Sequence, residues 1–263
     1  MRVAWAGGVA AVAAAGLLVA PTLGTSRVPP APPVPPKTLT VDGVVVGLVG
    51  VEPVVAVRLG TPSTLVVYAG SSRPGPPAPC EDHTEVRLVA QDAAEVRVAA
   101  FRYATREPVP ENHACALVGH PPAETALALA APLGSRRVLA NDREVVVHDP
   151  ATVLRATYLP RGVAGPGTVT FEPESATWTT VHDGAALGQS VRIVQAAPPL
   201  ARPSAYRVRA TVVRGHRATF GEVFGGWCVW WTERERLNVG VCAQGTPVPA
   251  TREELVRVAE GLA

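Results

Sequence analysis

The first 37 residues restrict the fold most, because they combine an apolar stretch suited to a membrane with a proline-rich stretch that leads to the folded part of the chain. An uncharged apolar run extends from Val3 to Ala20, and six prolines follow between Thr25 and Lys37. An apolar helix of this length spans roughly 27 Å, which is close to the thickness of a bilayer core. The prolines favour an extended polyproline II conformation. We therefore expect a membrane segment at residues 1–24 and an extracytoplasmic linker at residues 25–38.

The apolar run suits either an uncleaved anchor or a cleaved secretory signal. Thr22-Leu23-Gly24 offers a passable cleavage site, whereas Pro21 disfavours a cut directly after Ala20. Arg2 and the amino terminus favour an orientation with the amino terminus inside and the body outside. We favour a single-pass anchor in the cell membrane with an extracytoplasmic body. Secretion of a cleaved chain is the alternative, and a buried core helix is the third possibility.

Charge and composition narrow the function and the fold class. The chain has 24 Lys and Arg residues against 22 Asp and Glu residues, which gives a formal net charge of +2. This balance does not indicate a nucleic-acid-binding surface, because such domains carry a clustered excess of basic residues. Valine dominates the apolar residues, which favours strands over helices.

The four cysteines form two pairs, Cys80 with Cys115 and Cys228 with Cys242. An even number of cysteines on the outer side of a membrane indicates disulfide bonds. The first pair has an alternative, because Cys80, His83, His113 and Cys115 together offer four nitrogen and sulfur ligands for zinc. We favour the disulfide, because the location is oxidising and the spacing of the last two residues is unusual for zinc.

A hairpin pattern supports the second pair. Strands over residues 227–232 and 237–242 flank a charged loop, and a symmetric register pairs residue 228 with 242 and residue 230 with 240. Alternation then places Cys228, Cys242 and Trp230 on one face, with Trp230 over Gly240. Trp230 either covers this glycine and the disulfide or lines a binding surface. The opposite face receives only apolar side chains, namely Trp227, Val229, Trp231, Leu237, Val239 and Val241.

Short alternating segments predict a mainly β or α+β fold in two domains. Residues 39–148, which begin with a candidate strand at 39–49, have strand patterns and turn signals about every ten residues. This spacing predicts an antiparallel β-sandwich, with the Cys80–Cys115 bridge across one end. Residues 149–263 predict an antiparallel sheet with a short helix at its start and an amphipathic helix at its end.

Capping patterns define both of these helices. Asp149 precedes Pro150 and is suited to cap a short helix. Thr251 and Glu254 have the spacing of a capping box for the last helix. The apolar stripe of that helix should pack on the sheet that contains the tryptophan hairpin, and its members are Leu255, Val258, Ala259 and Leu262.

Several structural motifs carry a resemblance to a known class of proteins. Cys80, the strand around Val96, Cys115 and residues 131–136 resemble a module common in uncharacterised secreted and membrane-anchored actinobacterial proteins. The second half is similar to bacterial envelope domains with four recurring segments: Leu159-Pro160-Arg161-Gly162, Gly215-His216-Arg217-Ala218, Trp231-Thr232-Glu233 and a helix over Glu253–Glu260. The resemblance implies an envelope protein, and it brings no catalytic or cofactor-binding residue with it.

Motifs for catalysis are missing from the sequence. It has no nucleophile elbow, phosphate-binding loop, dinucleotide fingerprint or His-Glu-x-x-His pattern. Its two His-Asp pairs, His148-Asp149 and His182-Asp183, join strand neighbours that face opposite ways. We therefore expect no catalytic residue, cofactor or metal, and a non-enzymatic interaction or sensing protein of the envelope. Its expected partners are the membrane and another envelope protein or cell-wall component. The alternative functions are a lipid or lipoprotein carrier and a zinc-dependent hydrolase.

Overall fold

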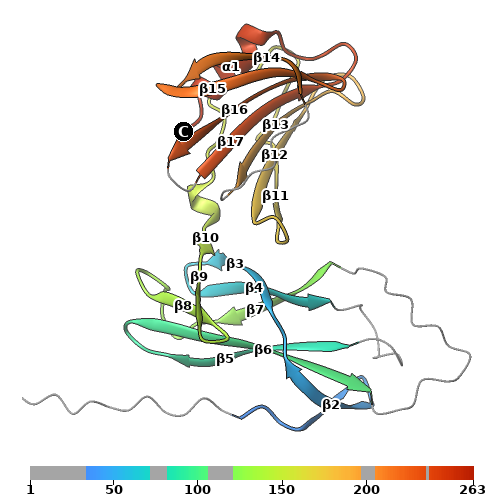
Figure 1. Cartoon of the computed structure of the whole chain (residues 1–263), viewed down its shortest axis with the longest axis vertical. Coiled ribbons are helices and arrows are strands. Elements are labelled where there is room, and N and C mark those ends of the chain that lie inside the picture. Colours follow the sequence, from blue (N-terminus) through green and yellow to red (C-terminus); the bar gives the residue numbers. More distant parts are fainter. Residues whose placement is uncertain (1–33, 72–81, 106–120, 197–204, 235–236) are drawn as a thin grey trace, which may run out of the picture. The chain divides into compact units, whose positions relative to one another are not determined.

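The computed structural model describes residues 34–71, 82–105, 121–196, 205–234 and 237–263, and within them the chain is mostly β (Figure 1). The mainly β fold with one helix near the carboxyl terminus confirms the predicted fold class. The predicted membrane segment lies outside the described residues. No helix among the described residues has the length and hydropathy of a membrane span.

The strands up to His148 form two sheets. The six-stranded sheet contains β1 (Thr38–Val41), β2 (Val44–Val51), β5 (His83–Gln91), β6 (Glu95–Thr105), β8 (Arg137–Ala140) and β9 (Arg143–Val145). The four-stranded sheet contains β3 (Val54–Thr61), β4 (Thr64–Ser71), β7 (Pro122–Ala128) and β10 (Val147–His148).

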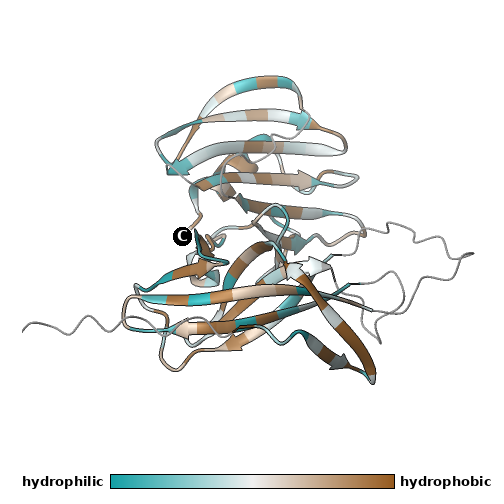
Figure 2. Ribbon diagram, turned by 60° about the horizontal axis from the view of Figure 1, so that its bottom comes forward, coloured by the Kyte–Doolittle hydropathy of each residue, from teal (hydrophilic) through white to brown (hydrophobic). Residues whose placement is uncertain are grey.

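These two sheets share one hydrophobic core, as expected for a sandwich. Val57 and Val67 of the four-stranded sheet meet Val96 and Val98 of the six-stranded sheet, and each of them is almost fully buried. Strand alternation places these valines on the inner faces. Along β6, Glu95 and Arg97 alternate with Val96 and Val98, whereas the neighbours of Val67 in β4, Val66 and Tyr68, are also buried. Figure 2 shows hydrophobic and hydrophilic residues interspersed along the strands. Burying one such side chain contributes about 1.5–3 kcal/mol, so the alternation itself selects the register.

The sandwich departs from the prediction in two ways. The single strand expected over residues 39–49 is a hairpin of β1 and β2, because Asp42 and Gly43 both have positive φ and turn the chain. The sheets are also not purely antiparallel, since β6 pairs with β8 and β3 pairs with β10 in parallel. Parallel pairing between strands distant in sequence leaves no turn signal, which explains why the sequence pattern did not reveal it.

Asn141 joins two strands that lie end to end beside β6. β2 pairs with the second half of β6 and β8 with the first half, which leaves a gap in the ladder between them. The Asn141 Nδ2 donates to the Glu52 carbonyl at 2.8 Å, and its Oδ1 accepts from the Ala100 amide at 3.1 Å. The backbone of Asn141 has a φ of 48°, a conformation that asparagine tolerates better than most residues. The side-chain amide thus takes the place of a peptide group in the ladder.

The strands from Thr168 onward form an antiparallel seven-stranded sheet in the order β11-β12-β13-β17-β16-β15-β14. Their bounds are β11 (Thr168–Glu172), β12 (Thr177–Asp183), β13 (Ser190–Ala196), β14 (Tyr206–Val213), β15 (His216–Val223), β16 (Gly226–Arg234) and β17 (Leu237–Gln244). Ahead of them, the short helix predicted after Asp149 is a single 3-10 turn, η1 (Pro150–Thr152), capped by the Asp149 carboxylate as expected.

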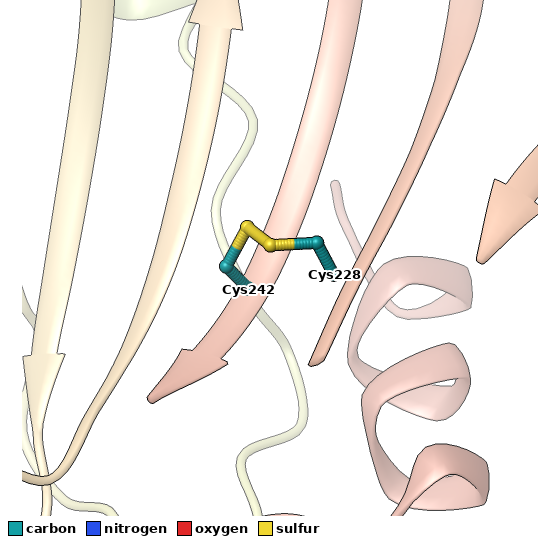
Figure 3. The surroundings of a disulfide bond; sticks show 2 residues. All are labelled: Cys228 and Cys242. Carbon is teal, nitrogen blue, oxygen red and sulfur yellow. A yellow bond between two sulfur atoms is a disulfide. The ribbon is translucent and has the colours of Figure 1, made fainter. Parts of the chain in front are cut away.

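The tryptophan hairpin has the predicted register. β16 and β17 pair residue 228 with 242, 230 with 240 and 232 with 238. Cys228 and Cys242 form a disulfide across the two strands, with their Cα atoms 4.1 Å apart (Figure 3). The apolar face of the hairpin lies in the second hydrophobic core, where Val229, Val239 and Val241 are fully buried. Both features depend on the same register, because a slip by one residue would exchange the two faces.

Helix α1 (Arg252–Glu260) packs on this apolar face, as predicted. Its capping box is complete: the Thr251 hydroxyl accepts from the Glu254 amide at 3.2 Å, and the Glu254 carboxylate accepts from the Thr251 amide at 2.8 Å. Leu255 and Val258 are fully buried in the same core as the hairpin. A helix of only nine residues is marginal alone, so this packing holds it in place.

Glu233 connects the hairpin with the turn between β14 and β15. Its carboxylate accepts from the Trp231 indole at 2.7 Å and from the Arg214 guanidinium at 2.9 Å. Arg214 also donates to the Leu262 carbonyl beyond the end of α1. Burial acts to raise the pKa of Glu233, but the hydrogen bonds from Trp231 and Arg214 outweigh it and hold the pKa below its usual value.

Candidate functional site

The disulfide face of the hairpin differs from the prediction in the position of Trp230. This residue pairs with Gly240 in register, but only its Cβ comes near that glycine. Its ring instead lies over Gly221 of β15, where an added Cβ would be 3.0 Å from the ring edge and 2.8 Å from Ala205. Gly221 has no side chain, which leaves room for the ring on this side. Trp230 therefore covers the adjacent strand, and its buried indole nitrogen has no hydrogen-bond partner among the described residues.

The zinc alternative falls largely outside the described residues. Cys80, His113 and Cys115 all lie there, as does the predicted Cys80–Cys115 disulfide. His83 begins β5, opposite Tyr103 of β6. Among the described residues, no cluster of three or more histidine, cysteine or acidic side chains is arranged to hold a metal ion. The first cysteine pair and its metal alternative both stay predictions.

Neither His-Asp pair forms a catalytic arrangement. His182 is buried, and its Nδ1 lies 3.1 Å from the Gly165 carbonyl, whereas Asp183 is exposed. His148 packs against Phe171 with ring centroids 5.2 Å apart, and burial lowers its pKa below the usual histidine value. Asp149 is occupied with capping η1. The histidines therefore act as packing residues, and the strand alternation expected from the sequence separates each from its acidic neighbour.

A pocket of about 330 Å³ lies on the outer face of the six-stranded sheet. This volume is at the lower end of the range for small-ligand sites. Polar groups of Arg97, Asn141 and Asp142 reach it, and the nearby Glu95 pairs with Arg97 at 2.6 Å. Most of its lining is apolar: Val34, Pro35, Val51, Val89, Ala99 and Phe101. Asn141, which bridges the gap between β2 and β8, also lines this pocket, so the pocket lies beside the gap in the strand pairing.

Residues 34–37, directly before β1, lie against the same sheet. The Lys37 carbonyl accepts from the Leu48 amide at 2.9 Å, and the Pro36 carbonyl accepts from the Tyr103 hydroxyl at 3.3 Å. Tyr103 is fully buried, and its burial, together with Glu85 nearby, raises the pKa of its hydroxyl. The last residues of the predicted linker therefore pack on the sheet and fix where the folded part begins.

Strand β14 forms an exposed edge of the seven-stranded sheet. Among the described residues it pairs only with β15, so its outer backbone groups lack a strand partner there. Val208 and Val212 are 53% and 59% exposed and alternate with Arg209, which is also exposed. Arg207 bulges from the strand with a φ of 52° and lies 3.2 Å from the Glu222 carboxylate. The edge thus presents an apolar row beside positive charge.

Comparisons of the chain with protein-family models, curated proteins and solved structures return no match. The resemblance to actinobacterial envelope proteins therefore stays a prediction from the sequence motifs.

Sequence reasoning missed both the pocket and the exposed edge. Asn141 lies in the turn between β8 and β9, and nothing in the sequence shows that its side chain bridges two strands. The edge position of β14 was equally hidden, although its signal was present: Arg207 and Arg209 interrupt an otherwise apolar strand. Charged residues at such positions are typical of edge strands.

Proposed function

We propose that this protein is a non-enzymatic interaction or sensing protein of the bacterial envelope, anchored by its amino-terminal segment with its body outside the membrane. The observation that carries the proposal is the exposed edge strand β14. Its backbone is free on one side among the described residues, and its side chains Val208 and Val212 face solvent. An edge of this kind supports recognition by strand addition, in which main-chain hydrogen bonds give affinity and alternating side chains give specificity.

The charge of the edge restricts the partner to an acidic extended segment. Arg209 lies on the opposite face of β14 from Val208 and Val212, because neighbouring residues of a strand alternate. A partner strand with acidic side chains on one face and apolar side chains on the other would match both rows. Arg209 also disfavours pairing of β14 with a second copy, since like charges would then approach each other.

Site-specific photo-crosslinking tests this proposal in the full chain in membranes of producing cells. A photoreactive residue at Val212 should give a discrete protein adduct, and Arg209→Glu should lower its yield at least fivefold. Val146 is the control, because it is 62% exposed between β9 and β10, away from β14, and should give no such adduct. Equal adducts from both positions, or none from Val212, would contradict strand addition at this edge.

The pocket on the six-stranded sheet supports a second candidate function, that of a carrier for a small apolar ligand. Its apolar lining and its volume of about 330 Å³ suit one short acyl chain or a ligand of similar size. Native mass spectrometry of the purified full chain should then show a bound lipid that Ala99→Leu displaces by filling the pocket. Ala93→Leu, on the exposed β5–β6 turn, should retain it. Identical spectra for both variants would remove this candidate.

A further inference from the structure

Three connections meet at one end of the seven-stranded sheet. They are the β12–β13 loop at residues 184–189, the β15–β16 turn at residues 224–225 and the segment after β17 at residues 245–250. The Gln189 side chain donates to the Pro247 carbonyl at 2.7 Å, and the Gly245 amide donates to the Gly225 carbonyl at 3.0 Å. These bonds hold the three connections together as one surface, called here the apolar end.

The apolar end contains no charged residue in any of its three connections. They read Gly-Ala-Ala-Leu-Gly-Gln, Phe-Gly and Gly-Thr-Pro-Val-Pro-Ala. The connections at the other end of the sheet are charged, with Glu174 between β11 and β12 and Arg214 between β14 and β15. Solvent-exposed loops are usually polar, so the contrast between the two ends requires an explanation.

Two large apolar side chains project from the apolar end into solvent. Leu187 is 103% exposed and Phe224 is 94% exposed, the highest values among the exposed large apolar residues of the described chain. A groove of about 310 Å³ lies between the β15–β16 turn and the segment after β17, and Tyr206, Glu222 and Trp227 are part of its lining. A single exposed leucine is ordinary, but two fully exposed apolar tips on neighbouring uncharged loops, with aromatic rings behind them, are not.

This arrangement matches the requirements of a lipid surface. Leucine and phenylalanine at loop tips lose unfavourable contact with water when they enter the boundary between headgroups and acyl chains. Tyrosine and tryptophan favour the same boundary because their rings are amphipathic. The charged residues near this end are Asp183, which precedes the first loop, and the pair of Arg207 and Glu222 beside the groove. The exposed Arg161 also lies here, because its neighbour Gly162 accepts a hydrogen bond from the Ala185 amide at 2.7 Å. Leu187 and Phe224 themselves carry no charge, and an arginine beside them suits an anionic headgroup layer.

We infer that the apolar end is a membrane-docking surface, in which Leu187 and Phe224 insert into the interfacial region of a lipid bilayer. This inference is independent of strand addition at β14, because the two surfaces use different residues. It adds a second contact with the membrane to the one expected from the amino-terminal segment. The competing explanation of the apolar end is that it binds a protein partner.

Depth-dependent fluorescence quenching tests the inference in the full chain reconstituted in vesicles of phosphatidylglycerol and phosphatidylethanolamine. An environment-sensitive probe on Leu187→Cys should be quenched by lipids that carry a spin label in the upper acyl chain. The control is Ser175→Cys, which is exposed in the β11–β12 turn at the other end of the sheet. Unmodified chain, treated with the same thiol reagent, corrects for any labelling of native cysteines.

The expected result is quenching at Leu187 at least twofold stronger than at Ser175, and a return to the Ser175 level when Phe224→Ser is added. Both probes are tethered to the same bilayer by the same chain, so the amino-terminal segment contributes equally to each. Equal quenching at the two positions overturns the inference, as does strong quenching at Leu187 that Phe224→Ser leaves unchanged. Strand addition at β14 would remain open under either result, because its crosslink is measured elsewhere.

Discussion

Replacing Asn141 with glycine should lower the free energy of unfolding of the β-sandwich by about 2 kcal/mol. The substitution keeps the positive φ of 48° accessible but removes both side-chain hydrogen bonds, to the Glu52 carbonyl and from the Ala100 amide. Each bond contributes on the order of 1 kcal/mol net, and a backbone group left without a partner adds to the loss where water does not reach it. Asn141→Ala should cost about 1 kcal/mol more, because alanine is strained at positive φ.

Urea unfolding followed by circular dichroism measures these differences, provided that the slope with denaturant stays constant. Asp142→Asn is the control. The Asp142 side chain is 84% exposed, and its ion pair with Arg97 is long, at 3.7 Å, so the change should alter the free energy of unfolding by less than about 0.5 kcal/mol. Asn141→Asp should be destabilised at neutral pH, since a carboxylate would face the Glu52 carbonyl. That contact raises the pKa of the new carboxyl in the folded state, so the loss should shrink as pH falls towards about 3.9, the ordinary aspartate value, because the protonated acid donates again. If Asn141→Gly unfolds within about 0.5 kcal/mol of the wild type, the bridging role of this side chain is refuted.

Three further perturbations address the seven-stranded sheet and the segment before it. The double change Cys228→Ala and Cys242→Ala should cost about 3 kcal/mol, because the bond closes a loop with a sequence separation of 14, and loss of this effect under reducing conditions checks its cause. Glu233→Gln should reduce the free energy of unfolding by about 1–2 kcal/mol at pH 7. The pKa of Glu233 is lowered in the folded state, so this difference should shrink as pH falls below the ordinary glutamate pKa of about 4.3. A difference that persists at pH 3 would contradict the argument. Gly167→Ala should cost about 3 kcal/mol in thermal or urea unfolding, because its Cβ would lie 2.7 Å from a buried histidine ring, whereas Gly165→Ala, with similar φ but open space, should cost about 1 kcal/mol.

Features governed by local sequence were predicted well. The register of the tryptophan hairpin follows from its symmetric strands and from the two cysteines, and the structure has that register. The capping box at Thr251 and Glu254 and the cap at Asp149 were also foreseen, because a cap requires only residues three or fewer positions apart. The apolar stripe of α1 and the apolar face of the hairpin were expected to meet, and they do.

Features that join distant parts of the chain were not predicted. The ring of Trp230 rests over Gly221 because of the neighbour that β15 supplies, and the sequence around the hairpin does not name that neighbour. The parallel pairing of β6 with β8 depends on a long connection whose path has no local signal. The pocket beside Asn141 combines residues from segments far apart in the sequence, from Val34 to Asp142.

By itself, the sequence determined that this chain is mainly β, which residues pair in its tryptophan hairpin, where its last helix begins, and which faces of both are apolar. Those properties depend on alternation, caps and turns, whose physical causes act over a few residues. Only the tertiary structure decided which strand lies at an edge, which loops meet at one end of a sheet and where a pocket opens. These depend on which strands become neighbours, and strand neighbours are chosen by the packing of the whole core and not by any single segment.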